Sequence, residues 1–191
     1  PTTAIHTTGL VRDFGRFQLG PLDLSVPVGY VTGLVGANGA GKTTLLKLLL
    51  GLQTPHSGSM DLLGARVDEL DTAAREDTGV VFDAPFVLPD WTVRKAGRAI
   101  APFYSRWDAD LFNALIERFH LAAKATVKSL SRGEGTKLML ALALAHQPRL
   151  LLLDEPTNDL DPATRRDLRE LFAEFVAADE HHTILFSTYI A

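Results

Sequence analysis

Gly36-Ala37-Asn38-Gly39-Ala40-Gly41-Lys42-Thr43-Thr44 is the stretch around which the rest of this chain is organised. The apolar run at residues 30–35 precedes it and predicts a buried strand. The leucine-rich run at residues 45–50 follows it and predicts a helix that ends at Gly51. Strand, glycine-rich loop and helix in this order are the context in which the pattern G-x-x-x-x-G-K-[ST] binds phosphate.

The residue types in this loop suit a phosphate group. Glycines let backbone N–H groups close around phosphate oxygens, and the following helix adds its partial positive charge. Lys42 is predicted to reach the β- and γ-phosphates of a nucleotide, and the Thr43 hydroxyl to bind Mg²⁺. The predicted nucleotide-binding residues here are Gly36, Asn38, Gly39, Ala40, Gly41, Lys42, Thr43 and Thr44. The alternative is a tight strand-to-helix turn with an incidental lysine.

Composition narrows the class of protein. The chain has 191 residues, 46% of them hydrophobic, which is enough for one sizeable domain or a domain with a subdomain. A net charge of −4 does not favour a general nucleic-acid binder. The sequence contains no cysteine, which excludes disulfides and thiolate metal sites, and its six histidines form no ligand set. No apolar run reaches the roughly 18–20 residues that span a bilayer, so we expect any membrane role to depend on a partner.

The flanking segments predict an α/β chain with an insertion. Strands are expected at residues 4–7, 22–26, 60–63, 78–82, 150–153 and 183–188, and turns at residues 11–17, 27–30 and 55–59. Residues 86–148 look helical, with Trp107, Leu111, Leu115 and Phe119 in one stripe after a predicted cap at Asp108. A further amphipathic helix is expected at residues 162–178. The predicted fold is therefore a single α/β domain over residues 1–191, with a helical subdomain at about residues 86–145.

Two acids end the most apolar strand. Asp154 and Glu155 follow four leucines, at the end of a strand where ligand sites of parallel sheets lie. Asp154 is expected to hold Mg²⁺, and Glu155 to polarise the water that attacks the γ-phosphate. The alternative is a solvated acidic strand end.

Taken together, these motifs resemble the nucleotide-binding domain of ABC transporters, over nearly the whole chain. Leu130-Ser131-Arg132-Gly133-Glu134 is similar to the family signature LSGGQ, although Arg132 and Glu134 depart from it. The resemblance implies a P-loop NTPase core, an antiparallel β subdomain and an inserted helical subdomain. It implies that Ser131 and Gly133 touch the γ-phosphate of a nucleotide bound to a second copy, and that Asp161 belongs to the D-loop. It also implies that Phe14 stacks on adenine. A helix cap alone is the other interpretation of Ser131.

Two positions depart from the family in ways that bear on chemistry. Asp83 stands where the family has Gln, and it is expected either to bind Mg²⁺ or to form a turn before Ala84-Pro85. Tyr189 stands where the family has its switch His, which leads to the hypothesis that hydrolysis is weakened while ATP binding persists. We therefore treat Tyr189, with Lys42 and Glu155, as a candidate catalytic residue. The chain stops soon after this position, where the family continues, so a truncated or minimal domain is expected.

The resemblance implies an ATPase that uses ATP and Mg²⁺, dimerises through ATP, and serves a membrane-spanning permease from the cytoplasmic side. Export is favoured by the similarity of the signature and of the Val-Val-Phe-Asp loop to bacterial exporters. One alternative is a soluble ABC ATPase acting on nucleic acid or the ribosome, although no second cassette or coiled-coil insertion is present. The other is a nucleotide-gated interaction module with weak hydrolysis.

Overall fold

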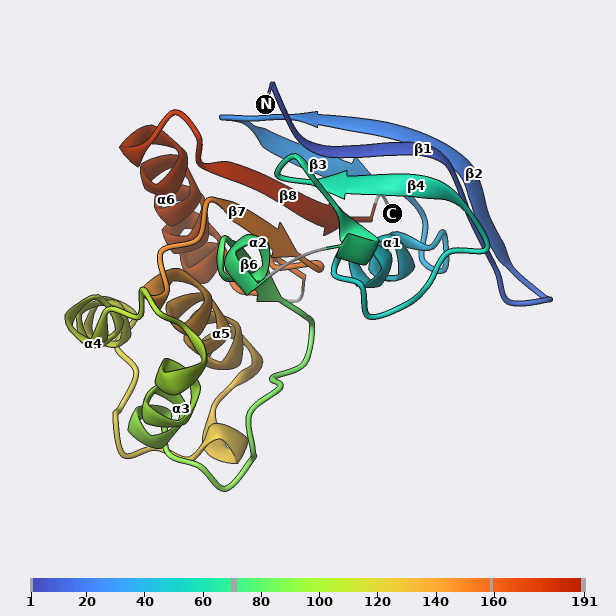
Figure 1. Ribbon diagram of the computed structural model, residues 1–191. Coiled ribbons are helices and arrows are strands. Elements are labelled where there is room, and N and C mark those ends of the chain that lie inside the picture. Colours follow the sequence, from blue (N-terminus) through green and yellow to red (C-terminus); the bar gives the residue numbers. More distant parts are fainter. Residues whose placement is uncertain (1, 70–71, 159, 190–191) are drawn as a thin grey trace.

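The computed structural model describes residues 2–69, 72–158 and 160–189. Its core is a pair of four-stranded sheets, one antiparallel and one parallel. Figure 1 shows the antiparallel sheet on one side of the parallel sheet, with helices α3, α4 and α5 on the other. The predicted α/β class is confirmed.

The antiparallel sheet has the order β2-β1-β4-β5. Its strands are β1 (Thr3–Asp13), β2 (Gln18–Pro27), β4 (Ser57–Leu62) and β5 (Ala65–Arg66). The turns predicted at residues 11–17 and 55–59 are shorter in the structure. Strand β1 continues to Asp13, and strand β4 already begins at Ser57. Register shifts around Gly9 let β1 keep both partners through this region, so the glycine interrupts the pairing without ending the strand.

The parallel sheet has the order β3-β8-β7-β6. Its strands are β3 (Val31–Val35), β6 (Thr78–Val81), β7 (Leu150–Leu153) and β8 (Thr183–Thr188). The prediction of a buried strand before the phosphate loop is wrong on burial: Val31 and Val35 of β3 are 46% and 52% exposed. The reason is its place at the sheet edge, which an apolar run does not specify.

The helices are α1 (Lys42–Leu49), α2 (Thr72–Glu76), α3 (Val93–Ile100), α4 (Ala109–Arg118), α5 (Arg132–Ala145) and α6 (Pro162–Ala178). Within the described residues, short 3-10 turns lie at Val67–Glu69, Ala101–Phe103 and Val127–Ser129. Asp108 caps α4 as predicted, accepting a hydrogen bond from the Leu111 N–H at 2.8 Å. The bounds of α6 match the predicted helix. Helices α3 to α5 all lie between β6 and β7 in the sequence, while the subdomain limits at 86–145 stay a prediction.

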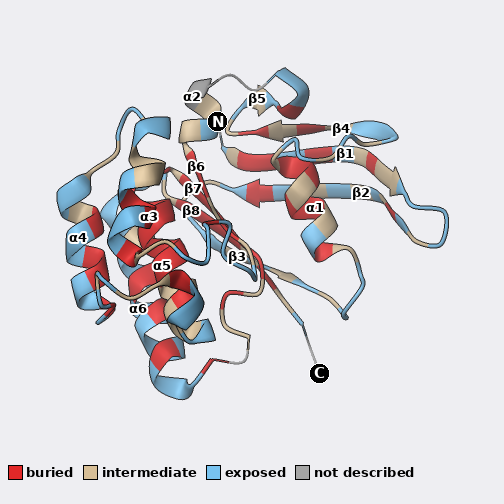
Figure 2. Ribbon diagram, turned by 90° about the horizontal axis from the view of Figure 1, so that it is seen from below, coloured by how far each residue is buried: buried red, intermediate tan, exposed pale blue. Residues whose placement is uncertain are grey.

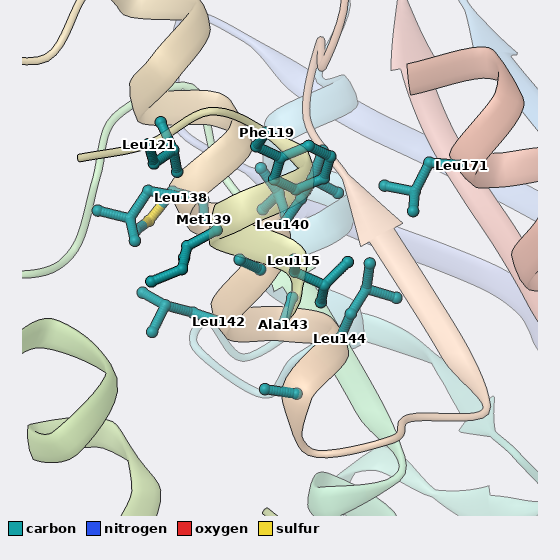
Figure 3. Packing of buried hydrophobic residues seen from close by; sticks show 14 of the residues in the cluster. Leu115, Phe119, Leu121, Leu138, Met139, Leu140, Leu142, Ala143, Leu144 and Leu171 are labelled. Carbon is teal, nitrogen blue, oxygen red and sulfur yellow. The ribbon is translucent and has the colours of Figure 1, made fainter. Parts of the chain in front are cut away.

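Strand β7 separates two hydrophobic cores. Leu150 and Leu152 face one core with α1 and the antiparallel sheet, while Leu151 and Leu153 face the other with α5 and α6. Figure 2 shows the central strands and α5 buried, with exposed residues on the outer faces of α4 and α6. Figure 3 shows the second core, where leucines of α5 meet Leu115 and Phe119. Because both faces of β7 are covered, its polar chemistry is confined to its carboxyl end.

Candidate functional site

The loop between β3 and α1 is shaped by its glycines. Gly41 caps α1 with a φ of 95°, and a Cβ atom there would lie 2.9 Å from side-chain atoms of Leu19 and Phe17. Glycine is therefore required at this position for both conformation and space. No side chain caps the first turn of α1, so its backbone N–H groups face the loop together with the helix dipole.

The ammonium group of Lys42 lies inside this loop. Its Nζ donates to the carbonyl oxygens of Gly36 and Ala37 at 2.8 and 3.1 Å, and it lies 3.5 Å from Oε1 of Glu155. The side chain is buried. A buried cation needs paired oxygens, and these three acceptors hold its charge at the centre of the loop.

Asp154 connects α1 to β8. Its Oδ2 accepts a hydrogen bond from the Thr43 hydroxyl at 2.7 Å, and its Oδ1 accepts one from the Ser187 hydroxyl, also at 2.7 Å. Asp154 is only 5% exposed and Ser187 is fully buried. Three elements distant in sequence thus converge on one carboxylate.

Glu155 is fixed beside it by backbone and side chain. Its backbone has a φ of 49°, a left-handed conformation that is unusual outside glycine and turns the side chain from the strand direction. Its N–H donates to the Ser187 hydroxyl at 2.9 Å, and its Oε2 accepts a hydrogen bond from the Asn158 amide. The side chain is 24% exposed, so water reaches it.

Ser187, which contacts both Asp154 and Glu155, was not predicted as a site residue from the sequence. Its hydroxyl donates to Asp154 and accepts from the Glu155 N–H, so it sets the relative position of the two acids. The signal in the sequence was a small hydroxyl residue near the end of an apolar strand, next to the predicted site.

Two of the predicted Mg²⁺ ligands, Thr43 and Asp154, lie next to each other in the structure. The Thr43 hydroxyl and the Asp154 carboxylate are adjacent hard oxygen donors, and Mg²⁺ commonly takes one or two protein ligands and keeps several waters. No group of three or more His, Cys, Asp or Glu residues with metal-binding geometry occurs among the described residues. The pair therefore fits a nucleotide-borne Mg²⁺ better than an all-protein metal cage.

Asp83 lies in the loop after β6 and forms an ion pair with Arg132. Its Oδ1 accepts a hydrogen bond from the Arg132 guanidinium at 2.5 Å, which ties the loop after β6 to the start of α5. The structure places this carboxylate beside the signature motif, and its role as a Mg²⁺ ligand stays a prediction.

The start of α5 is a capping box. The Ser131 hydroxyl accepts the Glu134 N–H at 3.3 Å, and the Glu134 carboxylate accepts the Ser131 N–H at 2.8 Å. The second of these bonds lowers the pKa of Glu134 below its usual value. Gly133 follows on the side of α5 that faces Leu160 and Thr164. Ser131 is thus a helix cap in the structure. Its contact with the γ-phosphate of a nucleotide stays a prediction.

Three further predicted residues lie outside the helices and strands. Phe14 is 45% exposed in the β1–β2 turn and stacks near Phe17, which lies against Gly41. Asp161 caps α6 by accepting the Ala163 and Thr164 N–H groups at 3.0 Å, and the bonds from Thr164 lower its pKa. Tyr189 is exposed just after β8, whose Thr188 pairs with Val35 ahead of the phosphate loop. Asp159 of the predicted D-loop lies outside the described residues.

The sequence of this chain is similar to those of known ATP-binding proteins. The sequence profile described as "ABC transporter" matches residues 19–158. The ABC transporter ATP-binding protein YdbJ of Bacillus subtilis (strain 168) is 34% identical over 97% of this chain and 61% of its own length. The Nod factor export ATP-binding protein I of Cupriavidus pinatubonensis (strain JMP 134 / LMG 1197) is 40% identical over 88% of this chain and 53% of its own length. The chain therefore spans between about half and two thirds of these curated relatives.

Solved structures agree on the fold. The ATP-binding subunit of an ABC transporter aligns with a TM-score of 0.87 and 27% identity, covering 98% of this chain and 80% of that one. A bacterial Atm1-family ABC exporter with ATP bound aligns at 24% identity and a TM-score of 0.82 over 99% of this chain and 35% of its own, which supports the fold alone. The described residues include no helix of the length and hydropathy needed to cross a membrane. With the P-loop NTPase fold, the antiparallel sheet, the inserted helices and these relatives in agreement, this chain belongs to the ATP-binding proteins of the ABC transporter family.

Proposed function

We propose that this chain binds and hydrolyses Mg-ATP at the interface of a head-to-tail dimer, as the ATP-binding subunit that drives transport by a membrane partner. The observation that carries the proposal is one continuous set of contacts. It runs from Lys42 to Glu155, through Ser187 to Asp154, and on to Thr43. One cation, two carboxylates and two hydroxyls connected in this way match the needs of phosphoryl transfer.

Nucleotide binding uses the loop and its lysine. The loop N–H groups and the first turn of α1 receive phosphate oxygens, and the Lys42 ammonium exchanges its carbonyl partners for the β- and γ-phosphates. Phe14 offers its exposed ring to adenine, from a turn that lies beside the loop. Thr43 and Asp154 hold Mg²⁺, which neutralises developing charge on the phosphates when it is bound.

Hydrolysis uses Glu155. Its carboxylate accepts a hydrogen bond from a water molecule and takes the proton as the water attacks the γ-phosphorus, so that ADP and phosphate leave. The Ser187 and Asn158 contacts hold the backbone and carboxylate of Glu155 while this happens. Ser131 and Gly133 of a second copy complete the γ-phosphate site, with Asp161 at the same interface.

The partner we propose is a membrane-spanning permease, and the direction of transport we propose is export. Support comes from relatives named as Nod factor export ATP-binding proteins. The proposed place of action is the cytoplasmic face of the membrane, where the chain is held by the permease. No nucleic-acid partner is proposed.

The test is a titration with Mg-ATP, followed by steady-state phosphate release. The Glu155→Gln variant should keep ATP affinity and lose turnover by roughly 10²- to 10⁴-fold, the usual contribution of a positioned general base. Absence of Mg-dependent ATP affinity in the parent protein would remove the proposal.

A second candidate, a nucleotide-gated module with weak turnover, is favoured by Tyr189. Its phenol is exposed where an imidazole is expected from the resemblance, and it offers one hydroxyl in place of two ring nitrogens. The Tyr189→His variant should then hydrolyse ATP faster than the parent while binding it equally well. Equal rates in the two proteins would eliminate this candidate.

A further inference from the structure

Two of the residues at which this chain departs from its family motifs, Asp83 and Arg132, meet in space. Asp83, in the loop after β6, and Arg132, in the first turn of α5, form an ion pair at 2.5 Å. They lie 49 residues apart in sequence and line the same cavity of ≈ 350 Å³ as Ser131. The pair therefore joins the loop after β6 to the signature motif at the start of α5.

The local charge explains why Arg132 needs an anion. A cation in the first turn of a helix opposes the helix dipole. Glu134, in the same turn, already uses its carboxylate in the capping box with Ser131. Asp83 supplies a second carboxylate from another element, and both members of the pair are substantially exposed. Such a pair contributes little to stability and exchanges readily with other charged groups.

The loop does not depend on this pair for its position. Pro85 lies against α5, with its Cγ 3.7 Å from the place that a Cβ of Gly135 would take. Val87 is buried in the core that contains α5. Neutralising Asp83 is therefore expected to change the charge at the helix start while leaving the loop in place.

We propose that Asp83 is a built-in competing anion for Arg132, and that Arg132 binds the phosphates of a nucleotide held by a second copy once Asp83 is displaced. This inference rests on the proposed head-to-tail dimer. Arg132 lies between Ser131 and Gly133, which face that nucleotide in the proposed function. By competing for Arg132, Asp83 then raises the ATP concentration at which two copies associate.

The proposal predicts opposite effects for the two members of the pair. Replacing Asp83 removes one competitor, so half-maximal dimerisation should need roughly 2- to 5-fold less ATP, as expected for an exposed ion pair. Replacing Arg132 removes a charged donor to phosphate, so about 10- to 100-fold more ATP should be needed. A pair with only a structural role would weaken dimerisation by similar amounts from either side.

The experiment is sedimentation velocity with increasing Mg-ATP, at fixed ionic strength, in the Glu155→Gln background so that the nucleotide persists. Four proteins are compared: the background, Asp83→Asn, Arg132→Gln and the double variant. The double variant should behave as Arg132→Gln does, because Asp83 has no target once the arginine is gone. Urea unfolding of each protein reports whether it is folded.

The matched control is the exposed ion pair of Arg118 on α4 with Glu174 on α6. Arg118→Gln and Glu174→Gln should leave the ATP dependence of dimerisation unchanged. Equal weakening by Asp83→Asn and Arg132→Gln, or no effect of either, would overturn the inference while leaving the dimer intact. A background protein that binds ATP but stays monomeric would overturn both the dimer and this inference, so the two failures are distinct.

Discussion

The phosphate loop and the start of α5 carry the same kinds of polar group in opposite settings. Around the loop, Lys42, Asp154 and Ser187 are buried and paired, Lys42 with Glu155 and Asp154 with Ser187. At α5, Ser131 and Arg132 are exposed, and Ser131 is satisfied within its own helical turn. The first region is assembled by tertiary structure, the second by local capping.

This difference shows what each region can do alone. Buried polar groups with fixed partners are preorganised, so the loop region is already arranged within one copy for the nucleotide that we propose. An exposed capped helix presents its dipole outward and needs a ligand brought to it. We therefore expect substitutions near the loop to act on binding and folding of a single copy, and substitutions at α5 to act mainly on association.

The largest expected effect is on ATP affinity in Lys42→Ala. This change removes a charged donor to the phosphates, worth about 2–3 kcal/mol, or roughly 30- to 150-fold in the dissociation constant. Isothermal titration with Mg-ATP measures it. Lys47→Ala, in the last turn of the same helix, is the matched control and should bind like the parent. If both variants lost affinity equally, the ammonium of Lys42 would not be the phosphate-binding group.

The next effect is on stability in Ser187→Ala. This change leaves a buried Asp154 oxygen and the Glu155 N–H without a partner, at a cost of about 1–3 kcal/mol in the free energy of unfolding. Urea unfolding gives the cost, and phosphate release should fall as well because Glu155 loses its anchor.

Thr183→Val is the control for Ser187, since Thr183 is also fully buried and lies at the other end of β8. It accepts the Gly29 N–H at 3.0 Å, far along the strand from the acids. Its unfolding free energy should fall similarly while turnover per folded molecule is unchanged. A matching loss of turnover in Thr183→Val would mean that Ser187 acts through general stability alone.

Local patterns predicted much of this molecule. The phosphate loop, the caps at Asp108 and Ser131, helix α6 and the apolar strand β7 each depend on residues close in sequence, and the structure shows all of them. Capping and periodicity are short-range, so they can be recognised without tertiary information.

What the sequence did not reveal depends on neighbours in space. The exposure of Val31 and Val35 follows from the position of β3 at the sheet edge, which strand order decides. The bridge made by Ser187 and the pair of Asp83 with Arg132 join segments more than thirty residues apart. A single sequence records no such pairing, so these contacts were missed or assigned another partner.

A smaller effect is expected at the start of α5, in Ser131→Ala. Loss of this cap should cost about 1 kcal/mol in the free energy of unfolding. Asp108→Ala, which removes the cap of α4, should cost about the same. The two variants should differ in ATP-dependent dimerisation, which only Ser131→Ala weakens. Equal ATP-dependent dimerisation of the two variants would show that Ser131 has only a structural role.

The smallest effect concerns the pH dependence of the capping box. The pKa of Glu134 is lowered in the folded chain by the hydrogen bond from the Ser131 N–H, so its stabilising contribution is present above the usual pKa of Glu. The contribution is lost as the pH falls through the lowered value, because the carboxylate then takes a proton.

In urea unfolding, Glu134→Gln should be less stable than the parent at pH 7, by less than about 1 kcal/mol since solvent screens this surface. The two proteins should converge as the pH falls below the lowered pKa of Glu134. Glu117→Gln, which removes an exposed carboxylate of α4, controls for the change in net charge. A gap between the parent and Glu134→Gln that stayed constant with pH would show that the carboxylate charge does not stabilise the start of α5, and the contrast with the charged phosphate loop would be sharper still.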